Sequence, residues 1–459
     1  MTSPDSLSRR LAAFATQLTY EQLPAHVVEA AKLHLLDLVG TALAAHGSGA
    51  GTYAASASLE LGGAGGASVI GQRDGRPAAV AALANGTLAH AIEFDDTHTA
   101  SICHISAVVV PAALAVAETH ARSGRELLAA IVAGNEVVAR VGADAAPAYM
   151  ETGFHPTSVC GVFGATAAAA RLRGLTADQT AHALGIAGSF AGGLFEYLGD
   201  GAATKSVHGG WAAHAGVSAA ALAACGGDGP AGVLEGRFGL YATHFRLDER
   251  DALGADWELG TRWETPAMSF KPYPACHFIA GALDAARLLL ADGLEADAIE
   301  QVVVAVPVAA VPLVCEPRAS KLRPRTPFEA KFSLPYSLAS LLVHGSLDVA
   351  TYRPERLLDE RVLALAERIR HQVEDFPHYP DVLPARVTVT RHDGGVVSEL
   401  SPDGPLAPPF TDDDVRRKFR GNAALALTET DLGALEAGLS RVENARDLHD
   451  LLGPLRRAR

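Results

Sequence analysis

The sequence predicts a mainly α fold, in which both ends of the chain form a large all-helical domain and an α+β domain is inserted between them. Two observations support this. From Leu7 to about Ala224, apolar residues recur at three- and four-residue spacing almost without a break. From about 267 to 400, strand-like runs such as QVVVAVPV (301–308) alternate with helices, and 411–456 is helical again. We therefore expect one domain at 1–266 plus 401–459 and another at 267–400.

The helical domain is divided by Gly- and Pro-rich breaks. Its expected elements are a helix after Pro24, a short strand at 67–72, and helices at 78–91, 106–121, 124–142, 159–172, 177–190 and 208–224. In the inserted domain we expect helices at 277–291 and about 329–344, and a strand and turn in ARVTVTRHDGG (385–395). Aromatic residues make up only 6% of the chain whereas Ala and Gly abound, so the helices are expected to pack closely.

Charge and composition exclude several classes of protein. The formal net charge of −14 argues against nucleic acid or anionic membranes as partners, and it means that an anionic substrate needs a locally positive site. The N-terminal segment lacks a long apolar run, so we expect no signal peptide and a cytoplasmic location. The five cysteines are widely spaced and include no C-x-x-C, which argues against a disulfide framework.

Four segments combine ionisable side chains with Gly, Pro or Thr in apolar surroundings. Lysine is rare, with six lysines among 38 basic residues, so each one has a raised chance of a specific role. The segments are HAIEFDDTHTASICH, with Glu93, Asp95, Asp96, Thr97, His98 and His104; GFHPTSVCGVFGA, with His155; GAATKSVHGGWAAHAG, with Lys205 and His208; and SFKPYPACHFIAGALDAA, with Lys271 and His277.

Each segment also has a purely structural interpretation. Asp95, Asp96 or Thr97 could cap a helix, His155 could be a packed turn residue, and Lys205 could be a solvated surface lysine. Together, however, the histidines, lysines and carboxylates suit proton abstraction next to a carboxylate, coupled to protonation of a leaving group. Lysines and helix N-termini would hold substrate carboxylates and stabilise the developing enolate-like charge.

Other chemistries lack their motifs. The chain has no G-x-G-x-x-G after a strand, no Walker A motif, no H-E-x-x-H and no G-x-S-x-G. One alternative stays open, because Cys103, Cys160 and Cys276 lie close in sequence to the candidate histidines. If those segments converge, the thiols could hold zinc or an iron–sulfur cluster for dehydration, although ligand cysteines usually include a close pair.

Five motifs in order, spread over nearly the whole chain, carry a family resemblance: NGTLAHAIEFDDTH, GFHPTSVCGVFGA, TKSVHGGWAA, FKPYPACH and AKFSLPYSLAS. The sequence resembles the MmgE/PrpD family, which includes 2-methylcitrate dehydratase, cis-aconitate decarboxylase and iminodisuccinate epimerase. The resemblance implies a helical domain with a smaller α+β lid, a homodimer, and an active site between domain and lid without metal or organic cofactor.

The resemblance also assigns residues. It implies catalytic roles for His104, His155, Glu93, Lys205, Lys271 and His277, and we expect Thr97, Asp96, His208 and Lys331 to bind substrate. Three departures weaken the transfer of any one substrate: Glu93 stands where Asp is usual, Ile105 follows His104 instead of Pro, and His98 occupies a position that is Trp in 2-methylcitrate dehydratases.

We therefore predict a cofactor-independent lyase that acts on a small di- or tricarboxylate by acid/base chemistry, most simply by dehydrating a hydroxy acid. His104 and His155 would be the proton-transfer pair, with Glu93 orienting or tuning one of them. Decarboxylation of the cis-aconitate type and epimerisation of the iminodisuccinate type use the same groups and stay open. The remaining alternative is a helical binding protein without catalytic activity.

Overall fold

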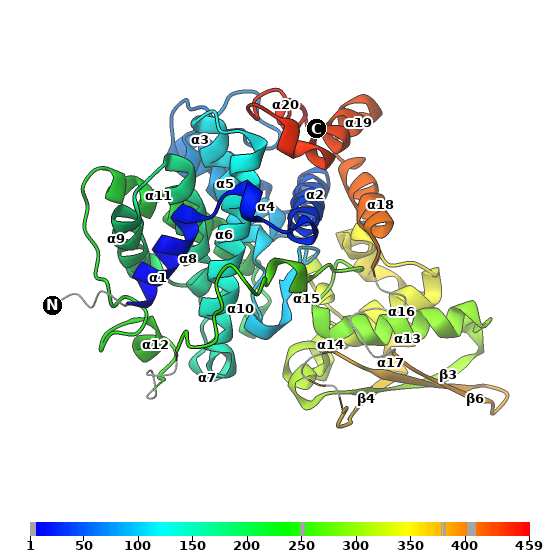
Figure 1. Ribbon diagram of the computed structural model, residues 1–459. Coiled ribbons are helices and arrows are strands. Elements are labelled where there is room, and N and C mark those ends of the chain that lie inside the picture. The colour runs from blue at the N-terminus through cyan, green and yellow to red at the C-terminus, as the bar shows by residue number, and fades with distance from the viewer. Residues whose placement is uncertain (1–5, 248–252, 378, 380–381, 402–409) are drawn as a thin grey trace.

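The chain folds around two hydrophobic cores in a computed structural model that describes residues 6–247, 253–377, 379, 382–401 and 410–459. The larger core takes residues from 7–268 and again from 419–455, and the smaller core takes residues from 273–389. Figure 1 shows the C-terminal helices, in orange and red, beside the blue helix α2 (Ala25–Gly47). The fold is mainly α, as predicted, and we propose the boundaries 1–266 plus 401–459 and 267–400 for its two domains.

Helices make up nearly all of the regular structure of the larger domain. None of the described helices combines the length and the hydropathy that crossing a bilayer requires. Besides α2, the domain contains α1 (Leu7–Gln17), α3 (Thr52–Leu61), α4 (Ala78–Ala89), α5 (Ser106–Thr119), α6 (Gly124–Ala143), α7 (Tyr149–Thr152), α8 (Pro156–Arg173), α9 (Ala177–Ala187), α10 (Tyr197–Asp200), α11 (Lys205–Ala224), α12 (Leu240–Thr243), α18 (Asp412–Ala423), α19 (Glu429–Ser440) and α20 (Gly453–Arg456).

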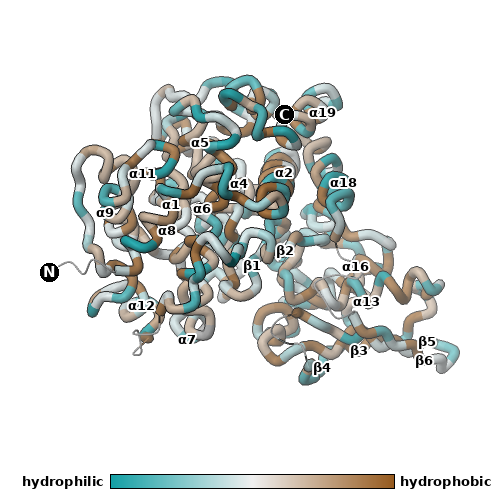
Figure 2. The backbone as a smooth tube through the Cα atoms, viewed as in Figure 1, coloured by the Kyte–Doolittle hydropathy of each residue, from teal (hydrophilic) through white to brown (hydrophobic). Residues whose placement is uncertain are grey.

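Small residues allow the central helices to approach closely. A Cβ atom added to Gly86 of α4 would lie 2.8 Å from the Cα of Gly210 on α11, so neither position has room for a side chain. In Figure 2 the hydrophobic stretches run through the middle of this domain, where α4, α5, α6 and α8 contribute buried Ala, Val and Leu. The abundance of Ala and Gly in the sequence thus has the expected consequence, since α11 is held tightly against α4.

The smaller domain packs helices against a four-stranded sheet with the strand order β4-β3-β5-β6. Strand β3 pairs in parallel with β4 and antiparallel with β5, which pairs antiparallel with β6. Its elements are β3 (Ile299–Val306), β4 (Ile369–Val373), β5 (Arg386–Arg391), β6 (Val396–Leu400), α13 (Ala280–Ala291), α14 (Arg318–Leu322), α15 (Pro327–Lys331), α16 (Leu334–His344) and α17 (Glu360–Glu367).

The expected strand at 67–72 is not present as a strand. This segment makes a single antiparallel bridge, Ala67 to Arg76, and then turns. The single helix expected at about 329–344 is divided into α15 and α16. The other expected elements exist with shifted ends, and α8 and α11 begin three residues earlier than predicted, at Pro156 and Lys205. Both shifts concern the site, because His155 becomes the N-cap residue of α8 and Lys205 becomes the first residue of α11.

A two-stranded ladder joins the two regions of sequence that carry most candidate residues. Strand β1 (Thr97–His98) pairs antiparallel with β2 (Met268–Ser269), with Thr97 opposite Ser269. Lys271 follows β2 by two residues. The ladder therefore fixes Lys271 next to the loop that contains Glu93.

Candidate functional site

The loop between α4 and β1 is the centre of the candidate site, and nearly all of it is buried. Glu93 in this loop has a φ of +57°, a left-handed backbone conformation that non-glycine residues rarely adopt. Such a conformation costs free energy and persists where surrounding contacts enforce it, which is common at functional sites. Here the contacts are made by the Glu93 side chain and carbonyl, both of which bind lysines.

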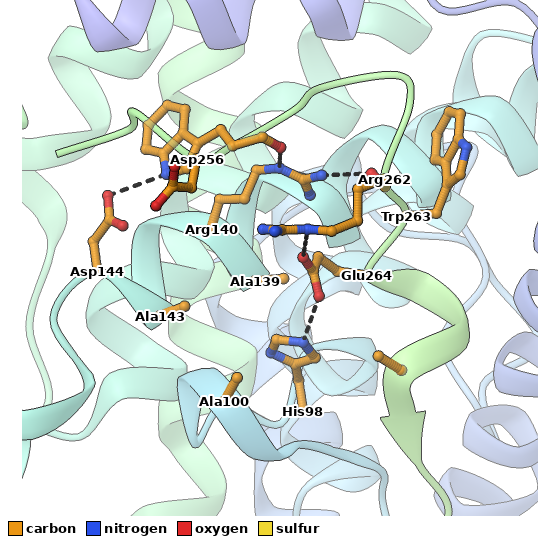
Figure 3. Close-up of a pocket in the computed structure, with 12 residues that line it drawn as sticks. His98, Ala100, Ala139, Arg140, Ala143, Asp144, Asp256, Arg262, Trp263 and Glu264 are labelled. Atoms are coloured by element: carbon orange, nitrogen blue, oxygen red, sulfur yellow. Dashed lines mark hydrogen bonds and ion pairs between the residues drawn. The ribbon is translucent and has the colours of Figure 1, made fainter. Parts of the chain in front are cut away.

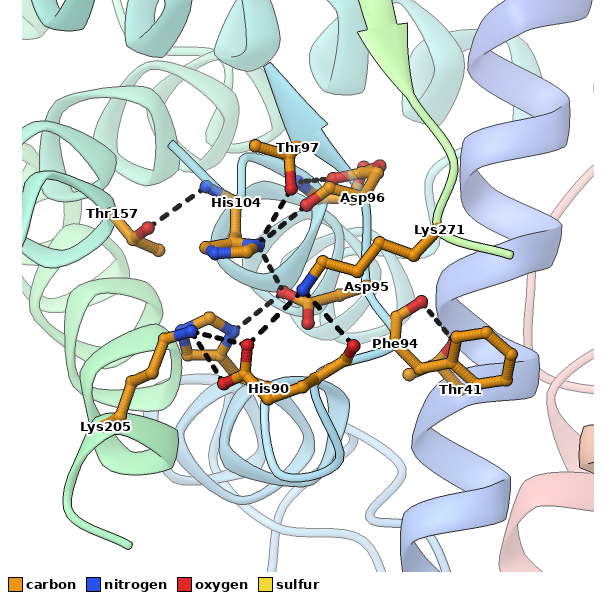
Figure 4. A network of polar contacts seen from close by, with 12 residues as sticks. Thr41, His90, Phe94, Asp95, Asp96, Thr97, His104, Thr157, Lys205 and Lys271 are labelled. Atoms are coloured by element: carbon orange, nitrogen blue, oxygen red, sulfur yellow. Dashed lines mark hydrogen bonds and ion pairs between the residues drawn. The ribbon is translucent and has the colours of Figure 1, made fainter. Parts of the chain in front are cut away.

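Two lysines share the carboxylate of Glu93. The Lys205 Nζ lies 2.6 and 2.7 Å from its two oxygens, and the Lys271 Nζ lies 3.3 Å from Oε2 and 3.2 Å from the Glu93 carbonyl oxygen (Figure 4). Burial alone would raise the pKa of Glu93, but the charge of Lys205 and then that of Lys271 outweigh it and hold the pKa at about 2. Glu93 is thus a buried carboxylate between two ammonium groups. One belongs to Lys205 at the start of α11, and the other to Lys271 at the edge of the smaller domain.

Asp95 accepts a hydrogen bond from His90 and lies close to a second imidazole, that of His104. Its Oδ2 lies 2.7 Å from His90 Nδ1 and 3.4 Å from His104 Nδ1, and all three side chains are buried or nearly so (Figure 4). Burial opposes ionisation of Asp95, yet the charges of His90 and His104 keep its pKa well below the usual range. Asp95 therefore stays ionised and orients both rings.

The protonated nitrogen of His104 can be assigned from its partners. Nδ1 lies 2.9 Å from the carbonyl oxygen of Asp96, which can only accept, so Nδ1 carries the proton. Thr157 Oγ1 accepts from the His104 backbone N–H at 3.0 Å. Burial, only partly offset by Asp95, holds the pKa of His104 well below its usual value, so that Nε2 is unprotonated near pH 7.

A second histidine pair lies next to His90 and His104. The Nδ1 atoms of His155 and His208 are 3.0 Å apart, and the His155 ring stacks on His90 with a centroid distance of 5.7 Å. Burial lowers the pKa of both rings, well below the usual value for His155 and to about 4 for His208. Tyr197 contacts both rings edge-on. Both imidazoles are consequently neutral near pH 7.

Thr97 and Asp96 contact His104 and its neighbours. Thr97 Oγ1 lies 3.4 Å from His104 Nδ1. The Asp96 carboxylate accepts from His34 Nδ1 at 2.8 Å and from the Ser106 N–H at 3.2 Å. Because both Asp96 oxygens are used within the protein, the geometry favours a supporting role for Asp96 over the predicted contact with substrate.

The smaller domain supplies His277 and Lys331. Burial, together with the charge of Lys271, lowers the pKa of His277 to about 3, and its Nδ1 has no hydrogen-bond partner among the described residues. Lys331 is buried, and its pKa is lowered to about 8 by burial while Glu93 acts in the opposite direction. Neither side chain hydrogen-bonds to the other candidates. Those candidates make two neighbouring sets of contacts, one of Glu93 with Lys205 and Lys271 and one of His104 with Asp95, Asp96 and Thr97 (Figure 4).

Sequence reasoning assigned no role to His90, His34 or Lys418. His90 begins the quoted HAIEFDD segment, and a histidine five residues before an aspartate was its available signal. Lys418 comes from α18, where its Nζ lies 2.8 Å from Asp37 Oδ1 and donates to the Phe94 carbonyl at 2.7 Å. No local pattern could have connected Lys418 to a loop more than 300 residues earlier.

The cysteine-ligated alternative lacks the required geometry. Among the described residues, one group of three or more His, Cys, Asp or Glu side chains has its potential ligand atoms within 4.8 Å of one another, and it consists of His90, Asp95 and His104. Cys103 and Cys160 interact with each other, and burial raises the pKa of the Cys103 thiol well above its usual value, which disfavours the thiolate that a metal needs.

A groove of about 510 Å³ is lined by the C-terminal part of α6, by residues from 256–267 and by His98 and Ala100 (Figure 3). His98 borders it and donates from Nε2 to Glu264 Oε2 at 3.3 Å, and Glu264 also receives a hydrogen bond from Arg262. Arg140 is bonded to the carbonyls of Trp257 and Arg262 and to Glu136. None of the ten residues predicted for the site lines this groove.

Two family models match most of this chain. The family model for the MmgE/PrpD N-terminal domain matches residues 9–252, and that for the MmgE/PrpD C-terminal domain matches residues 273–437. The cis-aconitate decarboxylase-like protein oryM of Aspergillus oryzae is 29% identical over 98% of this chain and 97% of its own length. The cis-aconitate decarboxylase of Homo sapiens is 30% identical over 83% of this chain and 80% of its own, and that of Aspergillus terreus is 26% identical over 96% and 94%.

Proposed function

Because the chain belongs to the MmgE/PrpD family, as its motifs predicted, we propose that it is a lyase that decarboxylates a small unsaturated tricarboxylate of the cis-aconitate type. The observation that carries the proposal is the juxtaposition of two ammonium groups on Glu93 with uncharged, oriented imidazoles. Sequence analysis placed dehydration first. The similarity to the cis-aconitate decarboxylases of Homo sapiens and Aspergillus terreus, and to the cis-aconitate decarboxylase-like protein oryM, supports decarboxylation instead.

Substrate carboxylates would be bound by Lys205 and Lys271. Their shared counter-ion, Glu93, keeps both ammonium groups in place in the absence of substrate, which avoids leaving two unpaired charges buried. Because one carboxylate serves two lysines, each lysine retains capacity for a further anionic oxygen. Electrostatic stabilisation of this kind is most effective where water is excluded.

Decarboxylation needs a proton donor more than a base. Loss of CO₂ breaks a carbon–carbon bond, and its electron pair passes into the conjugated C=C–carboxylate system. A proton delivered to carbon then completes the product. His155 would deliver that proton from Nε2 in its imidazolium form, with its Nδ1–H donating to His208 Nδ1, and the negative charge of the bound substrate would favour this protonated form. His104, with its lone pair on Nε2, would accept or relay a proton.

The test is to identify the product of each candidate reaction. Purified protein incubated with cis-aconitate in D₂O is expected to release CO₂ and give a product with one deuterium on carbon, as followed by NMR. Formation of an unsaturated product from 2-methylcitrate without CO₂ release would instead establish dehydration. Deuterium exchange into recovered iminodisuccinate, with no other product, would establish epimerisation.

The proposal also includes the absence of a required metal and a homodimeric state. Activity is expected to be unchanged after dialysis against a chelator, and loss of activity restored by a divalent metal would overturn this part. Size-exclusion chromatography with light scattering would test the dimer.

A further inference from the structure

Lys331 differs from the other lysines in having no oxygen partner in the part of the chain that the structure describes. Its side chain is buried, and among the described residues no carboxylate lies within ion-pair distance of its Nζ. Its Nζ lies 5.7 Å from the centroid of the Tyr352 ring. Each other lysine contacts carboxylate or carbonyl oxygens: Lys32, Lys205, Lys271, Lys321 and Lys418.

Lys331 is attached to the candidate site by backbone and ring contacts. Its carbonyl accepts from the Cys276 N–H at 2.9 Å, which ties the end of α15 to the segment between Lys271 and His277. The ring of the next residue, Phe332, lies 5.2 Å from the Lys205 Nζ.

The same short helix reaches the histidine pair. Phe328 of α15 contacts the ring of Tyr197 edge-on at 5.9 Å, and Tyr197 contacts both His155 and His208. Among the charged groups, Glu93 is the one that acts on the pKa of Lys331. Lys331 is therefore placed at the side of the site that faces the smaller domain.

An unpaired ammonium in such surroundings costs free energy of folding. The ammonium group of Lys331 therefore does not contribute to stability. Buried charges without a partner are expected where function requires them. We propose, on the basis of the proposed function, that Lys331 binds a carboxylate of the substrate that Lys205 and Lys271 do not hold. The three ammonium groups would then select a tricarboxylate over a dicarboxylate.

The experiment compares two ligands that differ by one carboxylate, propane-1,2,3-tricarboxylate and glutarate. Calorimetric titration at pH 7 measures the ratio of their Kd values for the wild-type protein and for Lys331→Met. We expect the wild-type protein to prefer the tricarboxylate at least tenfold, and the variant to reduce this ratio to about one. A ratio unchanged by the substitution would overturn the inference.

Two further variants and a stability measurement separate binding from folding. Lys32→Met removes the same charge from the surface of α2 and is expected to leave the ratio unchanged. The Tm of Lys331→Met is expected to equal or exceed that of the wild-type protein, because the lost charge had no partner, and a lower Tm would indicate a structural role instead. Lys331→Arg, which keeps the charge, is expected to retain part of the preference.

This experiment does not depend on turnover. A protein that prefers the tricarboxylate through Lys331 but releases no CO₂ would overturn the proposed function and leave this inference standing. Decarboxylation with a ratio insensitive to Lys331 would do the reverse.

Discussion

The Nδ1 atoms of His155 and His208 lie 3.0 Å apart, and this hydrogen bond joins the N-cap of α8 to the first turn of α11. A neutral imidazole has a single N–H, so one ring must donate while the other accepts. When His208 donates, the proton of His155 resides on Nε2. The pair therefore links the tautomer of a candidate acid to a residue that need not touch the substrate.

Replacement of His208 tests this coupling. His208→Ala is expected to lower kcat by about 10²-fold with little change in KM, because a positioned acid contributes about 10²–10⁴-fold. His208→Gln, whose amide can donate to His155, is expected to recover part of the loss. The control is His214→Ala on the same helix, where the ring binds the Ala79 carbonyl away from the site. A raised KM with unchanged kcat would instead assign His208 to substrate binding.

Glu93→Gln is expected to destabilise the protein as well as inactivate it. The substitution leaves Lys205 and Lys271 buried without a full counter-charge, and breaking a buried ion pair in this way costs about 3–5 kcal/mol. Urea unfolding at pH 7 measures the loss. The double variant Glu93→Gln with Lys271→Met is expected to be more stable than Glu93→Gln alone, and strictly additive losses would contradict the shared ion pair.

Stability at acid pH is expected to depend on His277. Burial lowers its pKa from 6.5 to about 3, so between these values the unfolded chain binds a proton that the folded chain does not. Stability therefore falls as pH falls through this window, by about 1.4 kcal/mol per pH unit for each such group. His277→Gln is expected to reduce the slope of unfolding free energy between pH 6 and 4 by about this amount. The exposed His26, changed to Gln, is the control, and equal slopes in all three proteins would refute the expectation.

The ion pair between Lys418 and Asp37 is expected to stabilise the contact of the C-terminal helix α18 with α2. Burial raises the pKa of Asp37 even though the charge of Lys418 lowers it. Removal of Lys418 would therefore leave a buried carboxylate without its counter-charge. Lys418→Met is expected to cost about 3–5 kcal/mol in urea unfolding, and Asp37→Leu combined with it to recover much of the loss. A double variant as unstable as the sum of the single ones would argue against a direct pair.

Periodicity and composition were sufficient for most helices of the larger domain and for the strands β3 and β5, because these runs have one clear apolar pattern. They missed α14 and α17 and the division between α15 and α16. They failed for β4 and β6, whose residues are largely exposed or half-buried and offer no apolar alternation. They also failed at 67–72, where an apolar run is buried without a neighbouring strand to extend the ladder. Helix starts at Pro156 and Lys205 were misplaced because the first residues there are small or polar.

The candidate site divides in the same way. Chemical type and order along the chain were enough to select Glu93, His104, His155, Lys205 and Lys271, since ionisable residues beside Gly, Pro and Thr in apolar segments are conspicuous by composition alone. Which of these side chains contact one another could not be predicted from the sequence. These contacts depend on distances between segments that are far apart in sequence. They include the carboxylate shared by two lysines, the pairing of His155 with His208, the support of a distant loop by Lys418 and the lack of an anion at Lys331. Burial then sets which of these groups is charged, and burial is a property of the packed molecule.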